Sequence, residues 1–345
     1  MPRTTLSLTN FVSGELSTKM SGRIDFEKYS SGCQTLENML IHPQGAATRR
    51  TGTQFISEVK TSSLKTRLIP FEFSTTQTYM LEFGNGYIRF FKEKGQILEG
   101  DITISGITKA NPGVVTATAH GYSDGDFVII SAVAGMTQVN GKTYKVASKT
   151  TNTFELQDVD GSNVDTSGYS TYSSAGTANK IYQITTSYTT AQLENLKFAQ
   201  SADTMYICHS SHEVSKLTRT GHTSWTLSEV DFAETGPYLA ANTTATTLTP
   251  ASSGTGSGVN ITASATTGIN GGDGFQTTDV GRILKFNSGE AKITARTNTT
   301  VVVCTITTAF TNTDATAAFS LGAFSDTTGH PSCVSFFEQR LVFAA

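Results

Sequence analysis

The residues best suited to chemistry are histidines and acidic side chains that lie close together in the sequence. His209 and His212, with Glu213 and His222 near them, form the only histidine cluster. Imidazole and carboxylate groups at this spacing could bind a metal ion if a helix placed them on one face. Residues 204–209 are instead typical of a buried strand, in which positions three apart face opposite sides. We therefore expect solvent-exposed loop histidines and no metal site.

Two acidic segments and one glycine-rich segment contain residue types found in ion, acid–base and phosphate sites. Residues 158–165 resemble a calcium loop but lack the third oxygen ligand before the glycine and the closing glutamate. Asp124 and Asp126 could act as a carboxylate pair, but they flank a glycine directly before an apolar strand, where aspartate forms turns. Residues 268–274 have enough glycines to hold a phosphate but are not followed by Gly-Lys-Ser/Thr. We expect turns or loops at all three positions.

No segment combines a nucleophile with a general base. The chain has no Gly-x-Ser-x-Gly sequence, and its histidines are dispersed. The cysteines, Cys33, Cys208, Cys304 and Cys333, form no Cys-x-x-Cys pair, which favours reduced structural thiols over disulfides or a zinc site. We expect a protein that is not an enzyme and uses no cofactor.

The composition indicates which elements must carry these residues. The 345 residues suffice for two or three domains. Threonine (58 residues) and serine (35 residues) are abundant, whereas only 15% of the residues are charged. Threonine is β-branched and fits a pleated, half-buried surface. The sequence therefore predicts a mainly β fold with few short helices.

Charge and hydropathy exclude several classes of protein. The net charge of −3 leaves no basic excess to bind phosphates or an anionic membrane. No run of 18 apolar residues occurs, and residues 1–5 lack the apolar stretch of a secretory signal. We expect no tight nucleic-acid binding, no stable membrane insertion and no export by that route.

The clearest local signal is a hairpin of two aromatic strands. Residues 79–83 and 87–91 flank an Asn-Gly pair, which tolerates the positive φ angles of a tight turn. Further strands are expected at about 113–118, 126–130, 142–146, 153–156, 204–209 and 301–306. Their spacing predicts small β domains.

Two helices and one terminal strand complete the predicted elements. Apolar residues at helical spacing predict a helix over residues 29–40, which Pro43 ends. Residues 190–198 could form a second short helix. Residues 335–343 are typical of an apolar strand that needs a partner from a longer polypeptide or a neighbouring subunit, so residue 345 looks like a cut.

Several motifs occur in a recognisable order. They include Phe11-x-Ser13-Gly14-Glu15-Leu16, Arg49-Arg50-x-Gly52-Thr53, Arg67-Leu68-Ile69-Pro70-Phe71, Ile88-Arg89-Phe90, Gly236-Pro237-Tyr238 and Phe337-Glu338-Gln339-Arg340-Leu341. Together they resemble the nozzle proteins, or tail tubular protein B type, of short-tailed bacteriophages. The resemblance spans most of the chain outside two insertions. That family usually has a proline soon after the histidine block, where this chain has Glu213-Val214.

The resemblance implies a structural virion protein built on a central β-barrel or propeller-like platform. Such a protein forms a ring, here expected to be a homo-hexamer, below the portal and adaptor, and double-stranded DNA leaves through its channel. Its partners would be the tail adaptor protein, tail fibres or spikes, and a needle or plug protein. It would be assembled in the host cytoplasm and located in the tail of the virion. A near-neutral chain suits a conduit because a strongly basic lumen would hold the phosphates.

The resemblance also divides the chain into segments. Residues 1–100 would form a platform segment, 101–180 an inserted domain, 181–239 a return to the platform, 240–322 a second inserted β segment, and 323–345 a platform strand. The first insertion is similar to the small β domain (FCCH type) first named in ubiquitin-activating enzymes. No ATP-binding motif accompanies it, so ubiquitin chemistry is not expected.

Assembly contacts are expected from basic and aromatic residues of the platform motifs. Arginines would pair with local carboxylates or with a partner, and aromatic side chains would pack in the core or in subunit interfaces. The candidates are Arg49, Arg50, Arg67, Phe71, Phe83, Arg89, Phe90, Phe337 and Arg340.

Two other functions remain open. In the first, a receptor-binding or fibre-docking tail module, the domain at 101–180 would recognise a cell-surface glycan through Tyr122, Tyr169 and Tyr172, although such aromatics are more often part of a β core. In the second, a cell-wall hydrolase, the chain would need paired carboxylates in a cleft or a metal triad, and the sequence offers neither.

Overall fold

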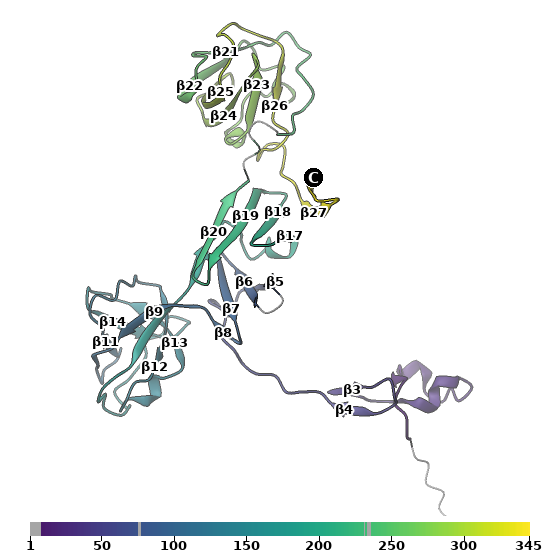
Figure 1. The fold of residues 1–345 in the computed structure, drawn as a ribbon, viewed down its shortest axis with the longest axis vertical. Coiled ribbons are helices and arrows are strands. Elements are labelled where there is room, and N and C mark those ends of the chain that lie inside the picture. The colour runs from purple at the N-terminus through teal and green to yellow at the C-terminus, as the bar shows by residue number, and fades with distance from the viewer. Residues whose placement is uncertain (1–7, 75–76, 231, 233–235) are drawn as a thin grey trace, which may run out of the picture. The chain divides into compact units, whose positions relative to one another are not determined.

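A computed structural model describes residues 8–74, 77–230, 232 and 236–345. The chain is mainly β, with a few short 3₁₀ helices, as its composition predicts (Figure 1). It divides into two compact units, residues 1–56 and 57–345. No helix in the described part of the chain has the length and apolarity needed to cross a membrane.

The first unit contains two small pairs of strands. β1 (Gly14–Glu15) pairs with β2 (Gly32–Cys33), and β3 (Met39–Ile41) pairs with β4 (Ala47–Arg49). Two 3₁₀ helices, η1 (Thr18–Met20) and η2 (Glu27–Ser31), lie between β1 and β2. No hydrophobic side chain is buried among the described residues 8–56.

The predicted helix over residues 29–40 is therefore wrong. Only η2 is helical there, Gly32 belongs to a strand, and Asn38 has a left-handed φ of 57°. An amphipathic helix is stabilised mainly by burying its apolar face, and the described part of this unit has no apolar core to receive one.

The second unit begins with two sheets, which we call the platform. One sheet has the order β16-β7-β6-β5, and β8 pairs with β7; the other has the order β17-β18-β19-β20. The bounds are β5 Arg67–Ser74, β6 Gln77–Gly84, β7 Tyr87–Lys92, β8 Gly95–Gln96, β16 Gln183–Thr185, β17 Lys197–Ser201, β18 Thr204–His209, β19 His212–Gly221 and β20 Ser224–Glu229. Both sheets contribute to one apolar core around Trp225.

Two predictions for the platform are confirmed, and one needs correction. The aromatic hairpin exists as β6 and β7, with Gly86 at φ 79°, and β18 is the expected buried strand. The helix expected at 190–198 is only a 3₁₀ turn, η4 (Leu193–Asn195), because β17 begins at Lys197. Leu193 and Leu196, at the two ends of this turn, are both buried in the platform core.

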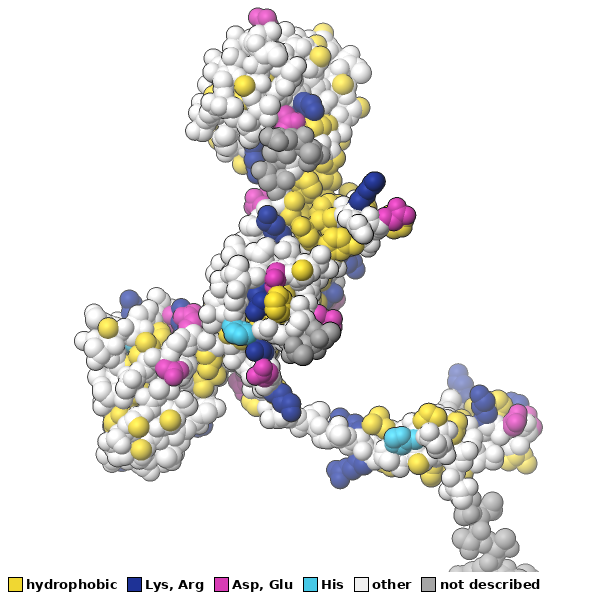
Figure 2. All heavy atoms as spheres, in the orientation of Figure 1, with side chains coloured by type: hydrophobic (Ala, Val, Ile, Leu, Met, Phe, Trp, Pro, Cys, Tyr) yellow, Lys and Arg dark blue, Asp and Glu magenta, His cyan; other side chains and the backbone are white. Residues whose placement is uncertain are grey.

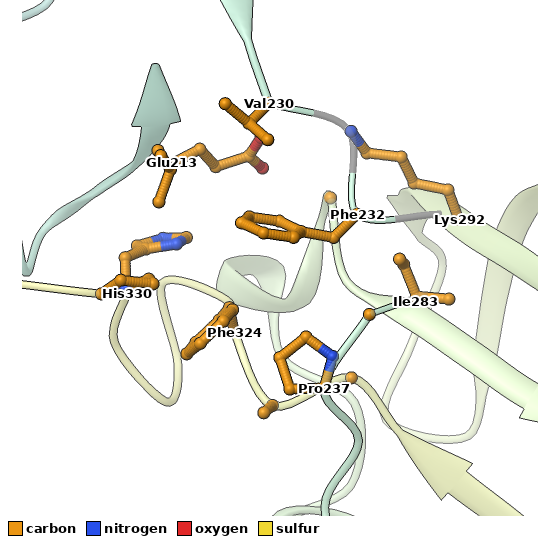
Figure 3. A pocket seen from close by; sticks show the side chains of 14 residues that line it. Glu213, Val230, Phe232, Pro237, Ile283, Lys292, Phe324 and His330 are labelled. Atoms are coloured by element: carbon orange, nitrogen blue, oxygen red, sulfur yellow. The ribbon is translucent and has the colours of Figure 1, made fainter. Parts of the chain in front are cut away.

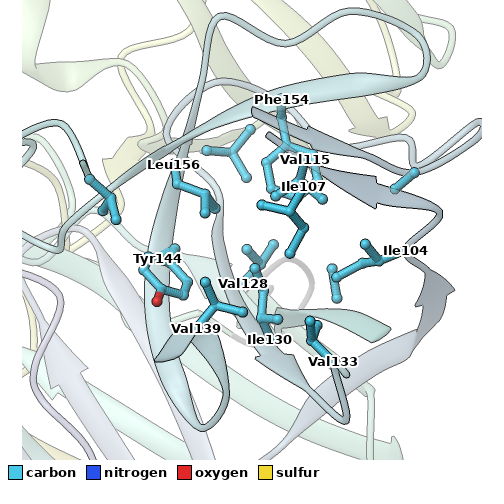
Figure 4. Close-up of a cluster of buried hydrophobic side chains, with 14 of the residues drawn as sticks. Ile104, Ile107, Val115, Val128, Ile130, Val133, Val139, Tyr144, Phe154 and Leu156 are labelled. Atoms are coloured by element: carbon cyan, nitrogen blue, oxygen red, sulfur yellow. The ribbon is translucent and has the colours of Figure 1, made fainter. Parts of the chain in front are cut away.

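The first β domain is a seven-stranded sheet with the order β10-β11-β14-β13-β12-β15-β9. Its elements are β9 Leu98–Thr103, β10 Gly106–Ile107, β11 Val114–Thr116, β12 Phe127–Ser131, η3 Thr137–Val139, β13 Lys142–Ala147, β14 Thr153–Gln157 and β15 Thr177–Ile181. Figure 4 shows its core, in which Val128, Tyr144 and Phe154 are buried. The strands predicted from the sequence in this region are confirmed as β11 to β14.

The second β domain has six strands in the order β21-β22-β25-β24-β23-β26. Its elements are β21 Leu248–Pro250, β22 Gly256–Ala263, η5 Asn270–Gly272, η6 Thr277–Asp279, β23 Ile283–Phe286, β24 Gly289–Arg296, β25 Val301–Thr308 and β26 Phe319–Leu321. It has its own apolar core, which includes Leu284 and Val302. The apolar strand predicted at 301–306 lies within β25.

The C-terminal segment forms a hairpin rather than a single strand. β27 (Cys333–Phe337) pairs with β28 (Arg340–Ala344), and Glu338 and Gln339 both adopt positive φ angles in the turn. Paired positive φ angles are typical of two-residue hairpin turns. The expectation that this segment needs an outside strand as partner is therefore wrong, because the partner strand lies within the segment itself.

Candidate functional site

The histidine cluster is a hairpin turn that joins β18 to β19. His209 and His212 pair across it, and their ring centroids lie 5.3 Å apart. His209 is buried, and burial lowers the pKa of both histidines. The expectation of exposed loop histidines is thus wrong for His209 and for the half-buried His212, since a two-residue turn brings positions three apart together. His222, in contrast, is exposed in the turn between β19 and β20, as expected.

These histidines are held by hydrogen bonds within the chain. The Nδ1 atom of His209 accepts a hydrogen bond from the Ser211 amide at 3.1 Å, and His212 Nε2 lies 3.0 Å from Gln192 Oε1. No group of three or more His, Cys, Asp or Glu residues suited to a metal ion occurs among the described residues. The hairpin is therefore a structural turn.

A pocket lies beside this hairpin, between the platform and the second β domain (Figure 3). Glu213 and Val230 line it from β19 and the end of β20, and Ile283 and Lys292 line it from β23 and β24. His330 closes another side, and its Nε2 atom lies 2.9 Å from Asp326 Oδ1. The described lining residues include no serine, threonine or cysteine that could serve as a nucleophile.

Glu213 is the acidic side chain among the described lining residues of the pocket, and its pKa is raised. Burial, followed by a hydrogen bond with Glu229, raises the pKa of Glu213 to about 7, whereas the nearby Lys292 opposes this rise. Glu213 can therefore hold or release a proton near neutral pH. This property suits a pH-dependent contact between the platform and the second β domain.

The acidic and glycine-rich segments form the turns and loop that the sequence predicts. Asp126 Oδ2 accepts a hydrogen bond from the Ser123 amide at 2.8 Å, and Asp124 Oδ1 accepts one from the Lys149 amide at 2.9 Å. Asp160 caps its own turn through the Ser162 amide at 2.9 Å. Residues 268–274 contain only the short helix η5.

The cysteines and the tyrosines proposed for glycan binding serve the fold. Burial raises the pKa values of the Cys208 and Cys304 thiols to about 12, which keeps them protonated and unreactive. Tyr122 is buried, and its hydroxyl donates to the Ala178 carbonyl at 2.8 Å. The half-buried Tyr172 similarly donates to Ile104 O at 3.0 Å. Tyr169 also packs against the core of the first β domain.

Five of the nine candidate assembly residues lie in the platform, where they are buried or hydrogen-bonded within this chain. Phe71, Phe83 and Phe90 are fully buried in the platform core, so they have no surface left for a second subunit. Arg67 Nη1 donates to the carbonyls of Leu193 and Leu196, both at 2.8 Å. Arg89 is also buried, and its guanidinium lies 4.8 Å from the ring centroid of Phe127 in the first β domain.

The other four candidates are exposed. Arg49 and Arg50 lie at the end of β4, where Arg50 Nε donates to Asn38 Oδ1 at 2.8 Å. Phe337 is 66% exposed, and Arg340 is exposed beside it at the turn of the C-terminal hairpin. These four side chains remain available to a partner.

Many exposed apolar side chains also lie in the first unit, and none of them is among the nine predicted assembly residues. Figure 2 shows hydrophobic side chains across this unit. Its exposed large hydrophobic residues are Leu8, Val12, Ile24, Phe26, Met39, Leu40, Ile41, Phe55 and Ile56. The sequence does contain a signal for this exposure, because these apolar residues occur in short pieces broken by glycines.

Comparison with known proteins identifies one part of the chain. Residues 110–181, which span most of the first β domain, match the family model described as "Ubiquitin-activating enzyme E1 FCCH domain". No curated protein matches the chain. The chain therefore carries an FCCH-like small β domain.

Proposed function

We propose that this chain is a structural subunit of a bacteriophage tail, of the nozzle type, that works by assembling into a ring around the passage for double-stranded DNA. The ordered motifs from Phe11 to Leu341 support this proposal through their resemblance to nozzle proteins. The ring would contain several copies of the chain and would contact the tail adaptor.

The observation that carries the proposal is the first unit. It combines several exposed large hydrophobic side chains with no buried one among residues 8–56. A unit of this size gains too little from burial to be stable alone, and grouped exposed apolar residues mark interaction sites. In an assembled ring, a neighbouring subunit would cover the apolar side chains that the first unit leaves exposed.

The remaining features are consistent with a passive structural role. The described lining of the pocket includes no serine, threonine or cysteine, and the acidic pairs are turn residues. The net charge of −3 would not retain DNA that moves through a channel.

Electron microscopy of the purified chain, alone and with the tail adaptor, tests the proposal. We expect rings of several subunits, and antibody labelling of intact particles should place the chain at the tail. Absence of the protein from particles, or a monomer in the presence of the adaptor, would overturn the proposal.

A further inference from the structure

The two β domains have the same topology. In the first domain, the six strands β10 to β15 have the order β10-β11-β14-β13-β12-β15. In the second domain, the six strands β21 to β26 have the order β21-β22-β25-β24-β23-β26. Numbering the strands of each domain from one to six gives 1-2-5-4-3-6 in both, and all neighbours are antiparallel.

The turn before the third strand is the same in both domains. Gly125 has φ 90°, its amide donates to Val146 O at 2.9 Å, and the Val146 amide donates to Asp126 O at 2.8 Å. In the second domain, Gly281 has φ 95°, its amide donates to Ile293 O at 2.8 Å, and the Ile293 amide donates to Arg282 O at 2.9 Å.

The hairpin between the fourth and fifth strands is also shared. The Thr153 amide donates to the Thr150 side chain at 3.0 Å, and the Val301 amide donates to the Asn298 side chain at 2.9 Å. A residue at the end of the second strand, or just after it, also binds this turn in each domain. The Ala117 amide donates to Asn152 O in the first domain, and the Ala263 amide at the end of β22 donates to Thr300 O in the second, both at 2.8 Å. These bonds align the two domains residue by residue.

The alignment places buried residues on buried residues. The aligned pairs are Val115 with Ile261, Ala117 with Ala263, Val128 with Leu284, Ile130 with Phe286, Val146 with Ile293, Phe154 with Val302, and Leu156 with Cys304. All fourteen side chains belong to the two domain cores.

Both domains contact the platform through the same turn and strand. In the first domain, Phe127 lies 4.8 Å from the Arg89 guanidinium and 5.9 Å from Lys60 Nζ, measured to the ring centroid. In the second domain, the aligned residue Ile283 lines the pocket beside Glu213. Lys145 in the first domain and Lys292 in the second are also aligned. Lys145 lies near Lys60, which precedes β5, and Lys292 lines the pocket with Glu213.

We propose that residues 248–321 form a second FCCH-like domain and that both domains dock on the platform through this one face. Charge distinguishes the two docking sites. The first has the cations Lys60, which precedes β5, and Arg89 of β7, with Glu82 near Arg89, whereas the platform presents Glu213 and Glu229 at the second. This inference does not depend on the proposed function in phage tails.

Charge reversal at the two aligned lysines tests the docking face. Lys292→Glu places a further carboxylate near Glu213, Glu229 and Asp326, and we expect amide exchange at His330, which donates to Ser210 O at 3.0 Å, to become about ten-fold faster. Lys145→Glu brings a carboxylate toward Lys60, so exchange in β16 at the other junction should become slower. Exchange within β14 and β25 controls for folding.

Each outcome decides the proposal. Opposite effects of the two variants support it, whereas equal effects, or no effect of Lys292→Glu at His330, would refute the shared docking face. An experimental structure of the full chain tests the repeat directly, and any strand order other than 1-2-5-4-3-6 in residues 248–321 would refute it.

Discussion

Glu213 should make the stability of the platform depend on pH. The pKa of its carboxyl rises from 4.5 to about 7 in the folded chain. The folded state therefore keeps a proton that the unfolded state releases between these values, so the contribution of Glu213 to stability is fully present below pH 4.5 and is lost as the pH rises to about 7. The full shift corresponds to about 3 kcal/mol, and screening by solvent at this half-buried site reduces our expectation to about 1–2 kcal/mol.

Denaturation at pH 5 to 8, followed by the fluorescence of Trp225, measures this dependence. Trp225 is the only tryptophan and lies in the platform core, on the strand next to that of Glu213. Glu213→Gln keeps the size of the side chain but does not titrate, so the loss of stability between pH 5 and 7 should largely disappear. Glu338→Gln, on the exposed turn of the C-terminal hairpin, is the control. An unchanged pH slope in Glu213→Gln would refute the reasoning.

Three further predictions concern the domains and the first unit. Phe154→Ala should destabilise the first β domain by about 3–5 kcal/mol, measured by hydrogen exchange in β13, because the ring is fully buried. Gly281→Ala should disturb the protein more than Gly125→Ala, as measured by melting temperature; a Cβ at Gly281 would lie 2.5 Å from Glu213 Oε1, whereas one at Gly125 meets nothing within 4 Å. Leu40→Asp should abolish assembly without changing the melting of residues 57–345, whereas Leu239→Asp, at a leucine that is also exposed but lies outside the first unit, should assemble normally in mass measurements.

Local sequence signals predict the β elements well. The Asn-Gly pair fixes the β6–β7 hairpin, and Val301 to Ile306 form a buried strand, because turn residues and β-branched runs act over short distances. The helix at 29–40 fails because a helical pattern needs an apolar surface to pack on, and the described first unit has no apolar core.

The pocket could not be predicted from sequence, because its residues come from distant segments. Glu213, Lys292 and His330 are brought together only by the path of the chain between the platform and the second β domain. The close approach of His209 and His212 did have a signal, since two strand-like runs flank the pair Ser210-Ser211. A two-residue connection between such runs predicts a hairpin, and a hairpin places its flanking residues opposite one another.

The second β domain shows why a repeated fold can differ in its residues. Tyr144 and Ala178 flank the third strand of the first domain, and the aligned positions in the second are Ala291 and Phe319. The large and small side chains have thus changed sides while all four stay buried. Cores tolerate such exchanges when the total volume and the apolar pattern are kept. Because backbone hydrogen bonds and glycine turns maintain the topology, the strand order persists where residue identities do not, and the family model matches only the first domain, at residues 110–181.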